Sequence, residues 1–490
     1  MNLRTAWKGK KENRKKVIIY GIWFIVNLLL FYCFIYNDIM ETMCVSIGFW
    51  DDLFSGRVRY FYASEWEMAS FAYAKTVHAT YDFPMYIIFA LWNFPIWIVK
   101  HFFGVNILES LICLIWGKSL LLVFSVIFAR ALYRLCITLD MTRENAKLVC
   151  LLFFTSNFFM TSVIMISAYD IIALYLSIEG INFYFKDNKK GFLGCFMLAV
   201  PLKFFPLLLF VPLLLLKEKR ILHVISSILL TILPILIFRL LLPARAVYGE
   251  PETVAFHIMD ALKGTENDGL IYWNITANEL PAALGRIYPS IFLWIICLFY
   301  CYLKKINAKE ELKKQGIYCC FLMFAILFTT SKSSPYWLLF LIPLVVILMG
   351  QNYKYLYVNL LLETIFTWGL ILGQILSFPW CFGNAIASGM LLSKIFGTQN
   401  TFVPITPLTV LEKLVDNNIM QGFLVGCGCS IFIAGLFLFA LINFPGWKKE
   451  FVFIVNEEKN PRGMIYLRIV TGIGIACIPI LLYIVGLRIG

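Results

Sequence analysis

Long runs of apolar residues alternate with short polar stretches along the whole chain. Many runs approach the roughly 20 residues that an α-helix needs to cross the hydrocarbon core of a bilayer. The pattern predicts an all-α fold, a polytopic transmembrane bundle of roughly ten to thirteen membrane segments with long extracytoplasmic loops. The expected segments are 17–36, 84–99, 106–129, 146–167, 171–185, 191–216, 221–242, 289–303, 316–331, 334–349, 354–378, 420–445 and 464–487.

The composition excludes a soluble globular domain. Of the 490 residues, 61% are hydrophobic and only 14% are charged, whereas soluble domains carry about 25% charged residues. The first apolar run, 17–36, is too long for a signal-peptide core and lacks a cleavage site of small residues, so we expect a retained span. The fourteen cysteines and four histidines are scattered, without the spacing of a metal site.

The net charge is +13, and the positions of the basic residues are more informative than this sum. They cluster between apolar runs, at 4–16, 186–190, 217–220, 304–314 and 447–450. Short loops rich in Lys and Arg stay on the cytoplasmic side of a membrane. The basic balance is therefore a topology signal, and we expect no nucleic-acid partner.

This orientation places three long loops, 37–83, 243–288 and 379–419, on the outer face. It leaves one ambiguity, because the path from the first of these loops to the basic residues that follow position 129 requires an odd number of crossings. Segments 84–99 and 106–129 are both apolar, so we expect one of them to be interfacial or re-entrant.

Segment 191–216 starts and ends at basic stretches and is too short for two full spans, which predicts a hairpin of two short arms. Its apex is PLKFFP, where Pro201 and Pro206 break the helix around Lys203. A charge inside a membrane segment costs at least about 2.5–3.5 kcal/mol. We therefore expect Lys203 to reach the outer headgroup level or a cavity at that depth.

Other ionisable side chains are expected at the same face. Asp38 directly follows the first span, Asp170 separates two spans, and Lys332 lies in the short turn SKSSPYW. Ionisable groups that converge at one depth indicate a functional site. Asp38 can act as a general base on a hydroxyl or ligate a divalent metal, and Lys203 and Lys332 can hold phosphate oxygens.

Each of these assignments has a structural alternative. Asp170 fits a helix N-cap, and Lys203 and Lys332 fit lysines that extend to lipid headgroups. Asp51 and Asp52 in the first outer loop fit solvated acids.

The sequence leaves open whether the protein binds a divalent metal, Mg²⁺ or Mn²⁺. Asp38 and Glu41 are its candidate ligands.

Four stretches follow a known pattern in order and spacing. They are Asp38 with the following FWDDLFSGRVRYFY, YDFPMYIIFALW at 81–92, SAYDIIALYL with GFLGCFMLAVPLKFFPLLLFVPLLLL, and SKSSPYWLLFLIPL. Together they resemble the C-type (GT-C) integral-membrane glycosyltransferases that use polyprenyl-phosphate sugars. The nearest branches are the bacterial polyprenol-phosphate-mannose-dependent transferases and the mannosyltransferase of glycolipid-anchor assembly. The chain departs from the family motifs at Gly56, which no proline follows closely, and at Ala168, where the family has glutamine.

The resemblance implies inverting transfer of mannose or another hexose from a polyprenyl-phosphate-linked donor to a lipid, glycan or protein acceptor. It implies that Asp38 and Asp170 are catalytic. It implies substrate-binding roles for Lys203, Lys332, Asp51, Asp52, Tyr81, Asp82 and Tyr336. It also implies a bacterial cytoplasmic membrane, with the site facing outward.

The resemblance further divides the chain into a catalytic membrane module, 1–350, and C-terminal transmembrane segments, 351–490. Two other function classes stay open. A transporter or flippase of lipid-linked sugars would carry charges near mid-bilayer and repeat symmetry. A polysaccharide polymerase or ligase would favour a large late outer loop with Arg and His, which 379–419 lacks and 243–288 contains.

Overall fold

The computed structural model describes residues 3–34, 36–69, 74–105, 110–242, 273–274, 286–287, 289–331, 334–378, 381–382, 405–415, 418–446 and 461–489. The N-terminal elements are α1 (Leu3–Cys33), α2 (Asn37–Phe54), η1 (Val58–Ala63), β1 (Trp66–Ala69), β2 (Ala74–Val77), α3 (Phe83–Phe103), α4 (Leu111–Thr138), α5 (Arg143–Phe154), α6 (Asn157–Phe159), η2 (Met160–Met165), α7 (Asp170–Phe185), α8 (Lys189–Ala199), α9 (Leu207–Lys217) and α10 (Ile221–Leu241). The later elements are β3 (Trp273–Asn274), β4 (Arg286–Ile287), α12 (Pro289–Leu303), α13 (Lys309–Thr330), η3 (Pro335–Phe340), α14 (Ile342–Gln351), η4 (Tyr353–Tyr355), α15 (Leu356–Ser377), α18 (Pro407–Leu414), α19 (Asn418–Ile442) and α20 (Arg462–Ile489).

The described part of the chain contains seven helices that are long and apolar enough to cross a membrane, as a multi-pass membrane protein requires. Two bent pairs, Ile18–Cys33 with Asp38–Phe54 and Arg143–Phe154 with Asn157–Met165, raise the count to nine if each pair is one span. Three further apolar helices are shorter: Leu207–Lys217, Pro289–Leu303 and Pro335–Gln351. The helical bundle is as expected, but the count of roughly ten to thirteen is reached only if these short helices also cross.

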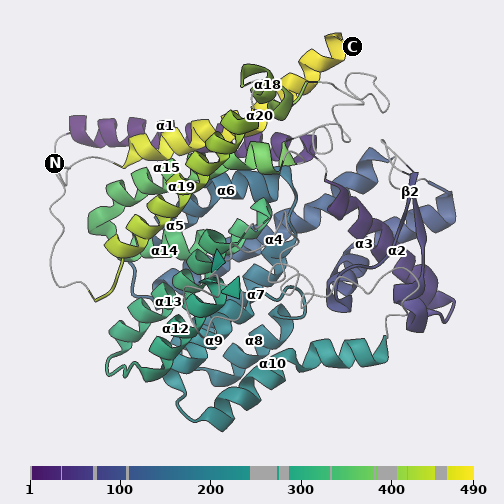
Figure 1. Ribbon diagram of the computed structural model, residues 1–490. Helices are drawn as coiled ribbons and strands as arrows, with labels where there is room; N and C mark the ends of the chain where they lie inside the picture. The colour runs from purple at the N-terminus through teal and green to yellow at the C-terminus, as the bar shows by residue number, and fades with distance from the viewer. Residues whose placement is uncertain are drawn as a thin grey trace.

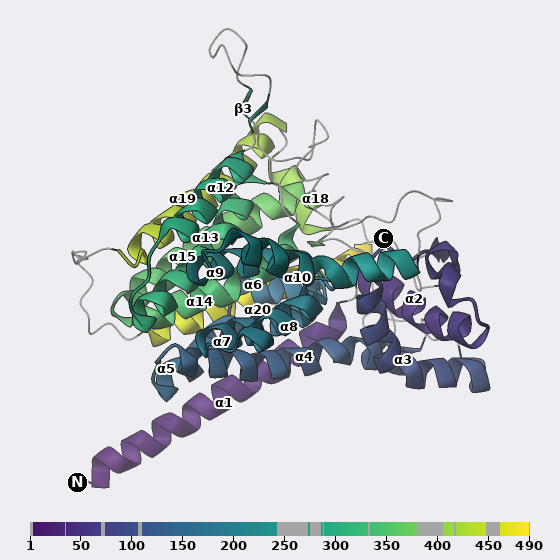
Figure 2. The same cartoon turned by 90° about the horizontal axis from the view of Figure 1, so that it is seen from below.

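Segments 84–99 and 106–129 correspond to α3 and α4, and both are long enough to span. Helix α3 packs mainly on α2 and less on α4. Figure 1 shows α2, α3 and the β1–β2 hairpin together at one side of the bundle, beyond the end of α1. In Figure 2 the N-terminal part of α1 extends past the other helices on the opposite side.

Segment 37–83, which the sequence predicts as a long outer loop, contains regular secondary structure in its described residues, 37–69 and 74–83. It contains α2, η1 and an antiparallel hairpin in which Trp66 pairs with Val77. A Cβ atom at Gly48 would collide with the Trp66 indole, so the hairpin approaches α2 at a point where only glycine fits. Helix α2 and the β1–β2 hairpin therefore form a folded cap, held together where Trp66 meets Gly48.

The predicted hairpin at 191–216 is confirmed as two short helices, α8 and α9, joined by the turn that holds Lys203. The arms pack through aromatic rings. The ring centroids of Phe192 and Phe210 lie 4.9 Å apart, and the two ring planes are nearly parallel. Pro201 and Pro206 lie in the turn, where a missing N–H breaks no helical hydrogen bond.

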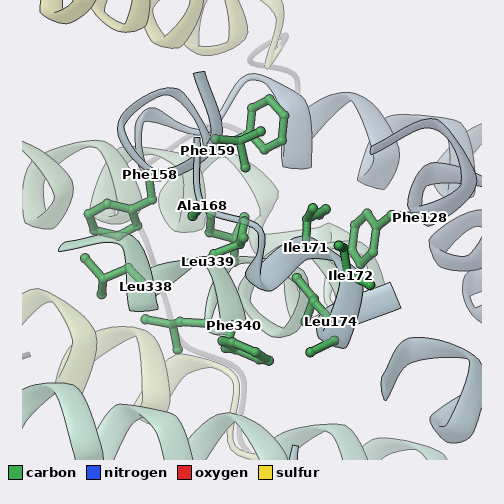
Figure 3. Close-up of a cluster of buried hydrophobic side chains, with 14 of the residues drawn as sticks. Phe128, Phe158, Phe159, Ala168, Ile171, Ile172, Leu174, Leu338, Leu339 and Phe340 are labelled. Carbon is green, nitrogen blue, oxygen red and sulfur yellow. The ribbon is translucent and has the colours of Figure 1, made fainter. Parts of the chain in front are cut away.

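A buried apolar cluster supports the start of α7 and the η3 segment. Figure 3 shows Ala168 and Leu339 close together, with Phe158 beside Leu338 and with Ile171 to the right, near Phe128. Ala168 and Ile171 flank Asp170, and Leu338 and Leu339 follow Tyr336 closely in the chain. The same core therefore fixes two segments that carry polar side chains.

Two buried cations join distant helices. Arg468 of α20 lies 3.0 Å from Glu363 of α15, with side-chain exposures of 0% and 3%. The Oγ of Ser156 also donates to Glu363, at 3.0 Å. Lys118 of α4 donates to the carbonyl oxygens of Phe31 and Phe34 and so caps the end of α1.

Candidate functional site

The buried ion pair of Asp170 and Lys203 forms the centre of the candidate site. Lys203 Nζ lies 3.3 Å from Asp170 Oδ1, and the two residues are 8% and 1% exposed. Asp170 begins α7, where the partial positive charge of a helix N-terminus favours a carboxylate. A buried charge is stable only when it is paired, so each residue requires the other.

Asp170 does not act as a side-chain N-cap. Tyr169 occupies the N-cap position of α7, without a capping hydrogen bond. Apart from the ammonium group of Lys203, the described residues place no hydrogen-bond donor on the carboxylate of Asp170. The contact with Lys203 is therefore the polar interaction that this carboxylate makes within that part of the chain.

Two tyrosine rings lie near the ammonium group of Lys203. Lys203 Nζ lies 5.6 Å from the centroid of the Tyr81 ring and 5.8 Å from that of Tyr336. Aromatic faces attract cations at this range. Tyr81 precedes α3 and Tyr336 belongs to η3, so the lysine brings three separate segments together.

Tyr81 connects this cluster to Asp38. Its hydroxyl donates to Asp38 Oδ2 at 3.2 Å, and its ring packs edge-on against Tyr169 at 5.2 Å. Burial, with the nearby Tyr169 and Asp38, raises the pKa of Tyr81 well above its usual range, so the hydroxyl keeps its proton. We use the name tyrosine–lysine cluster for Asp38, Tyr81, Asp170, Lys203 and Tyr336.

Local contacts hold Asp38 and Tyr81 in place. Asp38 lies in the first turn of α2, directly after the 69° bend from α1. The backbone of Tyr81 accepts a hydrogen bond from the Tyr62 hydroxyl at 3.0 Å. The Tyr86 hydroxyl accepts from the N–H of Thr80 at 2.8 Å. The loop before α3 is therefore anchored on both sides of the tyrosine.

The hairpin tip is held against η3 by aromatic packing. The Phe205 ring lies 5.0 Å from Trp337 and 5.4 Å from Phe340. Because Phe205 is two residues from Lys203 and Trp337 follows Tyr336, this contact sets the spacing between the ammonium group and the tyrosine ring.

The other predicted substrate-binding residues have partners elsewhere. Asp51 accepts from the Trp97 indole at 2.7 Å and pairs with Lys100 at 3.3 Å. Asp52 accepts from Ser64 at 2.7 Å and pairs with Arg57. These contacts tie α2 to α3 and to η1.

Asp82 and Lys332 complete the set of predicted residues. Asp82 pairs with Arg239 of α10 at 3.2 Å. Burial raises the pKa of Asp82, and the guanidinium of Arg239 opposes that rise. Lys332 lies outside the described residues.

A metal ion would find limited ligation at this site. Asp38 and Glu41 are one turn apart on α2, and within the described ranges no three His, Cys, Asp or Glu side chains group as a metal site. Mg²⁺ is often held by one or two carboxylates together with substrate phosphates. Asp38 and Glu41 would then be its protein ligands, and the ion would supply charge neutralisation of a phosphate.

Sequence reasoning did not identify Tyr169, Lys118 or Arg239. Tyr169 adjoins Asp170, and its buried hydroxyl has no hydrogen-bond partner in the described part of the chain. Lys118 and Arg239 each interrupt an apolar run, which is the signal by which Lys203 was found. The partners of Lys118 and Arg239 are far away in the sequence, so the pattern of apolar residues does not show which groups these two cations contact.

No protein-family model, curated protein or solved structure matches the chain. Function is therefore inferred from the chemistry of the cluster itself. It offers one buried cation, a carboxylate that orients it, and a second carboxylate held by a tyrosine hydroxyl. This set can hold an anionic group at Lys203 and accept a proton at Asp38.

Proposed function

We propose that the chain is a membrane glycosyltransferase of the GT-C type. It moves a sugar, mannose or another hexose, from a polyprenyl-phosphate-linked donor to a hydroxyl of a lipid, glycan or protein acceptor. The observation that supports this most is the convergence of Asp38, Tyr81, Asp170 and Lys203 from four separate segments. The proposal places the site on the extracytoplasmic side of a bacterial cytoplasmic membrane.

The proposed reaction is a direct displacement. Lys203, oriented by Asp170, holds the donor phosphate. Asp38 removes the proton from the acceptor hydroxyl, whose oxygen attacks the anomeric carbon. The bond from that carbon to the phosphate oxygen breaks, and polyprenyl phosphate leaves with the electron pair. The configuration at the anomeric carbon is inverted.

Each residue has a distinct share in this mechanism. Tyr81 positions the Asp38 carboxylate through its hydrogen bond, and the ring of Tyr336 lies near the ammonium group of Lys203. The buried setting strengthens the attraction between Lys203 and a phosphate, because the local dielectric constant is low. Lys332, Asp51, Asp52 and Asp82 remain candidates for substrate contacts.

The test is a donor-turnover assay. Purified protein in lipid is offered polyprenyl-phosphate-linked mannose, glucose, galactose and aminoarabinose, with mixed membrane glycolipids as acceptors and with or without Mg²⁺ or Mn²⁺. The proposal predicts release of polyprenyl phosphate from one of these donors. Release from none of them would contradict it, and movement of labelled lipid-linked sugar between leaflets would then favour a flippase.

A further inference from the structure

A groove of about 260 Å³ lies between α13, η3, α15 and α19. Its walls are mostly apolar and include Leu338, Leu370, Val425 and Phe432. The groove does not include the residues of the tyrosine–lysine cluster, and the reaction as described makes no use of it.

The groove adjoins the cluster through η3. Tyr336 packs its ring near Lys203, and Leu338, two residues later, lines the groove. Trp337 between them packs on Phe205 of the hairpin tip, at 5.0 Å. The short helix η3 thus takes part in the cluster through Tyr336 and lines the groove through Leu338.

One polar side chain in the groove lacks a partner. Gln374 is 4% exposed, and its Oε1 has no hydrogen-bond partner among the residues described. A buried polar atom without a partner is destabilising, and a ligand hydroxyl can offset that cost. Whichever way the amide is turned, it offers a hydrogen-bonding atom to the polar end of a lipid.

The groove also opens at the exposed apolar side of the bundle, beside α19. Ile433 of α19 lines it and is 37% exposed. Helix α19 carries further exposed apolar side chains, such as Phe423 and Phe437, as a lipid-facing helix does. A hydrocarbon chain can thus enter sideways from the bilayer.

We propose that this groove binds the hydrocarbon chain of the lipid-linked sugar donor, next to the phosphate held by Lys203. The inference rests on the proposed function, since it assigns the chain of the same substrate. It assigns to the segments after residue 350 a role in donor binding. Gln374 contacts the polar end of the donor, and Leu370, Val425 and Phe432 contact the chain.

Gly373 allows the groove to be filled. A Cβ atom there would lie 3.6 Å from Cys429 Sγ and 3.7 Å from the Val425 carbonyl oxygen, which are ordinary contacts. Gly373→Leu would add carbon atoms between α15 and α19 where Gly373 lines the groove, and Gly373→Ala would add only a methyl group there. Gly426→Leu on α19 is the matched control, because a Cβ at Gly426 meets nothing within 4 Å.

The first experiment compares the KM of a long-chain donor with that of a donor cut to two isoprene units. Gly373→Leu is expected to raise the long-chain KM about tenfold, as the loss of roughly two buried CH₂ groups would. The KM of the short donor should not change in Gly373→Leu. Both KM values should stay at wild type in Gly426→Leu. Equal effects on both donors, or a rise in the KM of a lipid acceptor instead, would overturn the assignment.

The second experiment does not depend on turnover. A polyprenyl phosphate with a photoreactive group on its chain is cross-linked to the full chain in lipid, and the adducts are mapped. Adducts on α15 or α19 at the groove, reduced by Gly373→Leu and by Ile433→Trp, support the inference even if no sugar is transferred. Adducts confined to other helices would overturn it and leave the proposed function standing.

Discussion

Lys203 and Asp170 form a buried ion pair of 3.3 Å, although one lies in a hairpin turn and the other begins a helix. Each charge is stable in the protein interior because of the other. The pair gives the site a fixed cation at a defined place. Two tyrosines and Asp38 are arranged around it.

Removing one member of this pair should reduce stability. Asp170→Asn leaves the Lys203 ammonium buried without a counter-charge, and we expect the free energy of unfolding to fall by roughly 3–5 kcal/mol. The double variant Asp170→Leu/Lys203→Met should recover most of that loss without recovering turnover. Thermal unfolding in detergent measures both variants. A double variant as unstable as the single one would contradict the interpretation.

Tyr81→Phe should separate activity from stability. The substitution removes the hydroxyl that donates to Asp38 and keeps the ring that faces Lys203. We expect turnover to fall about tenfold, in line with the roughly 1.5 kcal/mol of a hydrogen bond to a charged group. Tyr353→Phe, at a residue 50% exposed, is the control. Unchanged turnover in Tyr81→Phe would exclude a positioning role.

The C-terminal helix should depend on its buried ion pair. Glu363→Gln leaves Arg468, which is fully buried, without its counter-charge, and we expect a loss of roughly 3–5 kcal/mol. Glu144→Gln removes an exposed pair with Lys147 and should change stability by less than about 0.5 kcal/mol. Equal unfolding midpoints for the two variants would show that the buried pair does not stabilise α20.

A pH effect is expected at Asp187, in the turn between α7 and α8. Hydrogen bonds from Lys217 and Lys309 lower the pKa of Asp187 below its usual value. Because the pKa of the Asp187 carboxyl is lower in the folded state, its ionised form stabilises the protein at any pH above the pKa that this carboxyl has in the unfolded chain. This contribution disappears as the pH falls through the pKa that the carboxyl has in the folded protein. Asp187→Asn should therefore lower the unfolding midpoint at pH 7. The difference from wild type should shrink in acid, and a constant difference would contradict the assignment.

Sequence patterns predicted part of this architecture for physical reasons. Prolines on both sides of Lys203 in a short apolar segment require a turn, and the turn is present. Asp38 and Asp170 lie at the ends of apolar runs, and this position indicated that they would sit at segment boundaries. Both residues belong to the tyrosine–lysine cluster.

Other features depend on partners that are distant in the chain. The ion pair between Glu363 and Arg468 joins helices far apart in sequence, so hydrophobicity alone does not reveal it. The cap formed by α2 and the β1–β2 hairpin uses strands of only four residues, too short for a clear alternation of side chains. Helices such as α9, with 11 residues, also make the number of crossings ambiguous.

The most direct test of the central claim is single-turnover release of polyprenyl phosphate, with enzyme in saturating excess over donor, comparing wild type with Asp38→Asn. A proton acceptor in the transition state contributes about 10²–10⁴-fold in rate, so Asp38→Asn should lose at least about a hundredfold while donor binding stays unchanged. Glu144→Gln, at an exposed site, should release product at the wild-type rate. Release by Asp38→Asn within about twofold of wild type would contradict the account, because no measurable part of the rate enhancement would then come from this carboxylate.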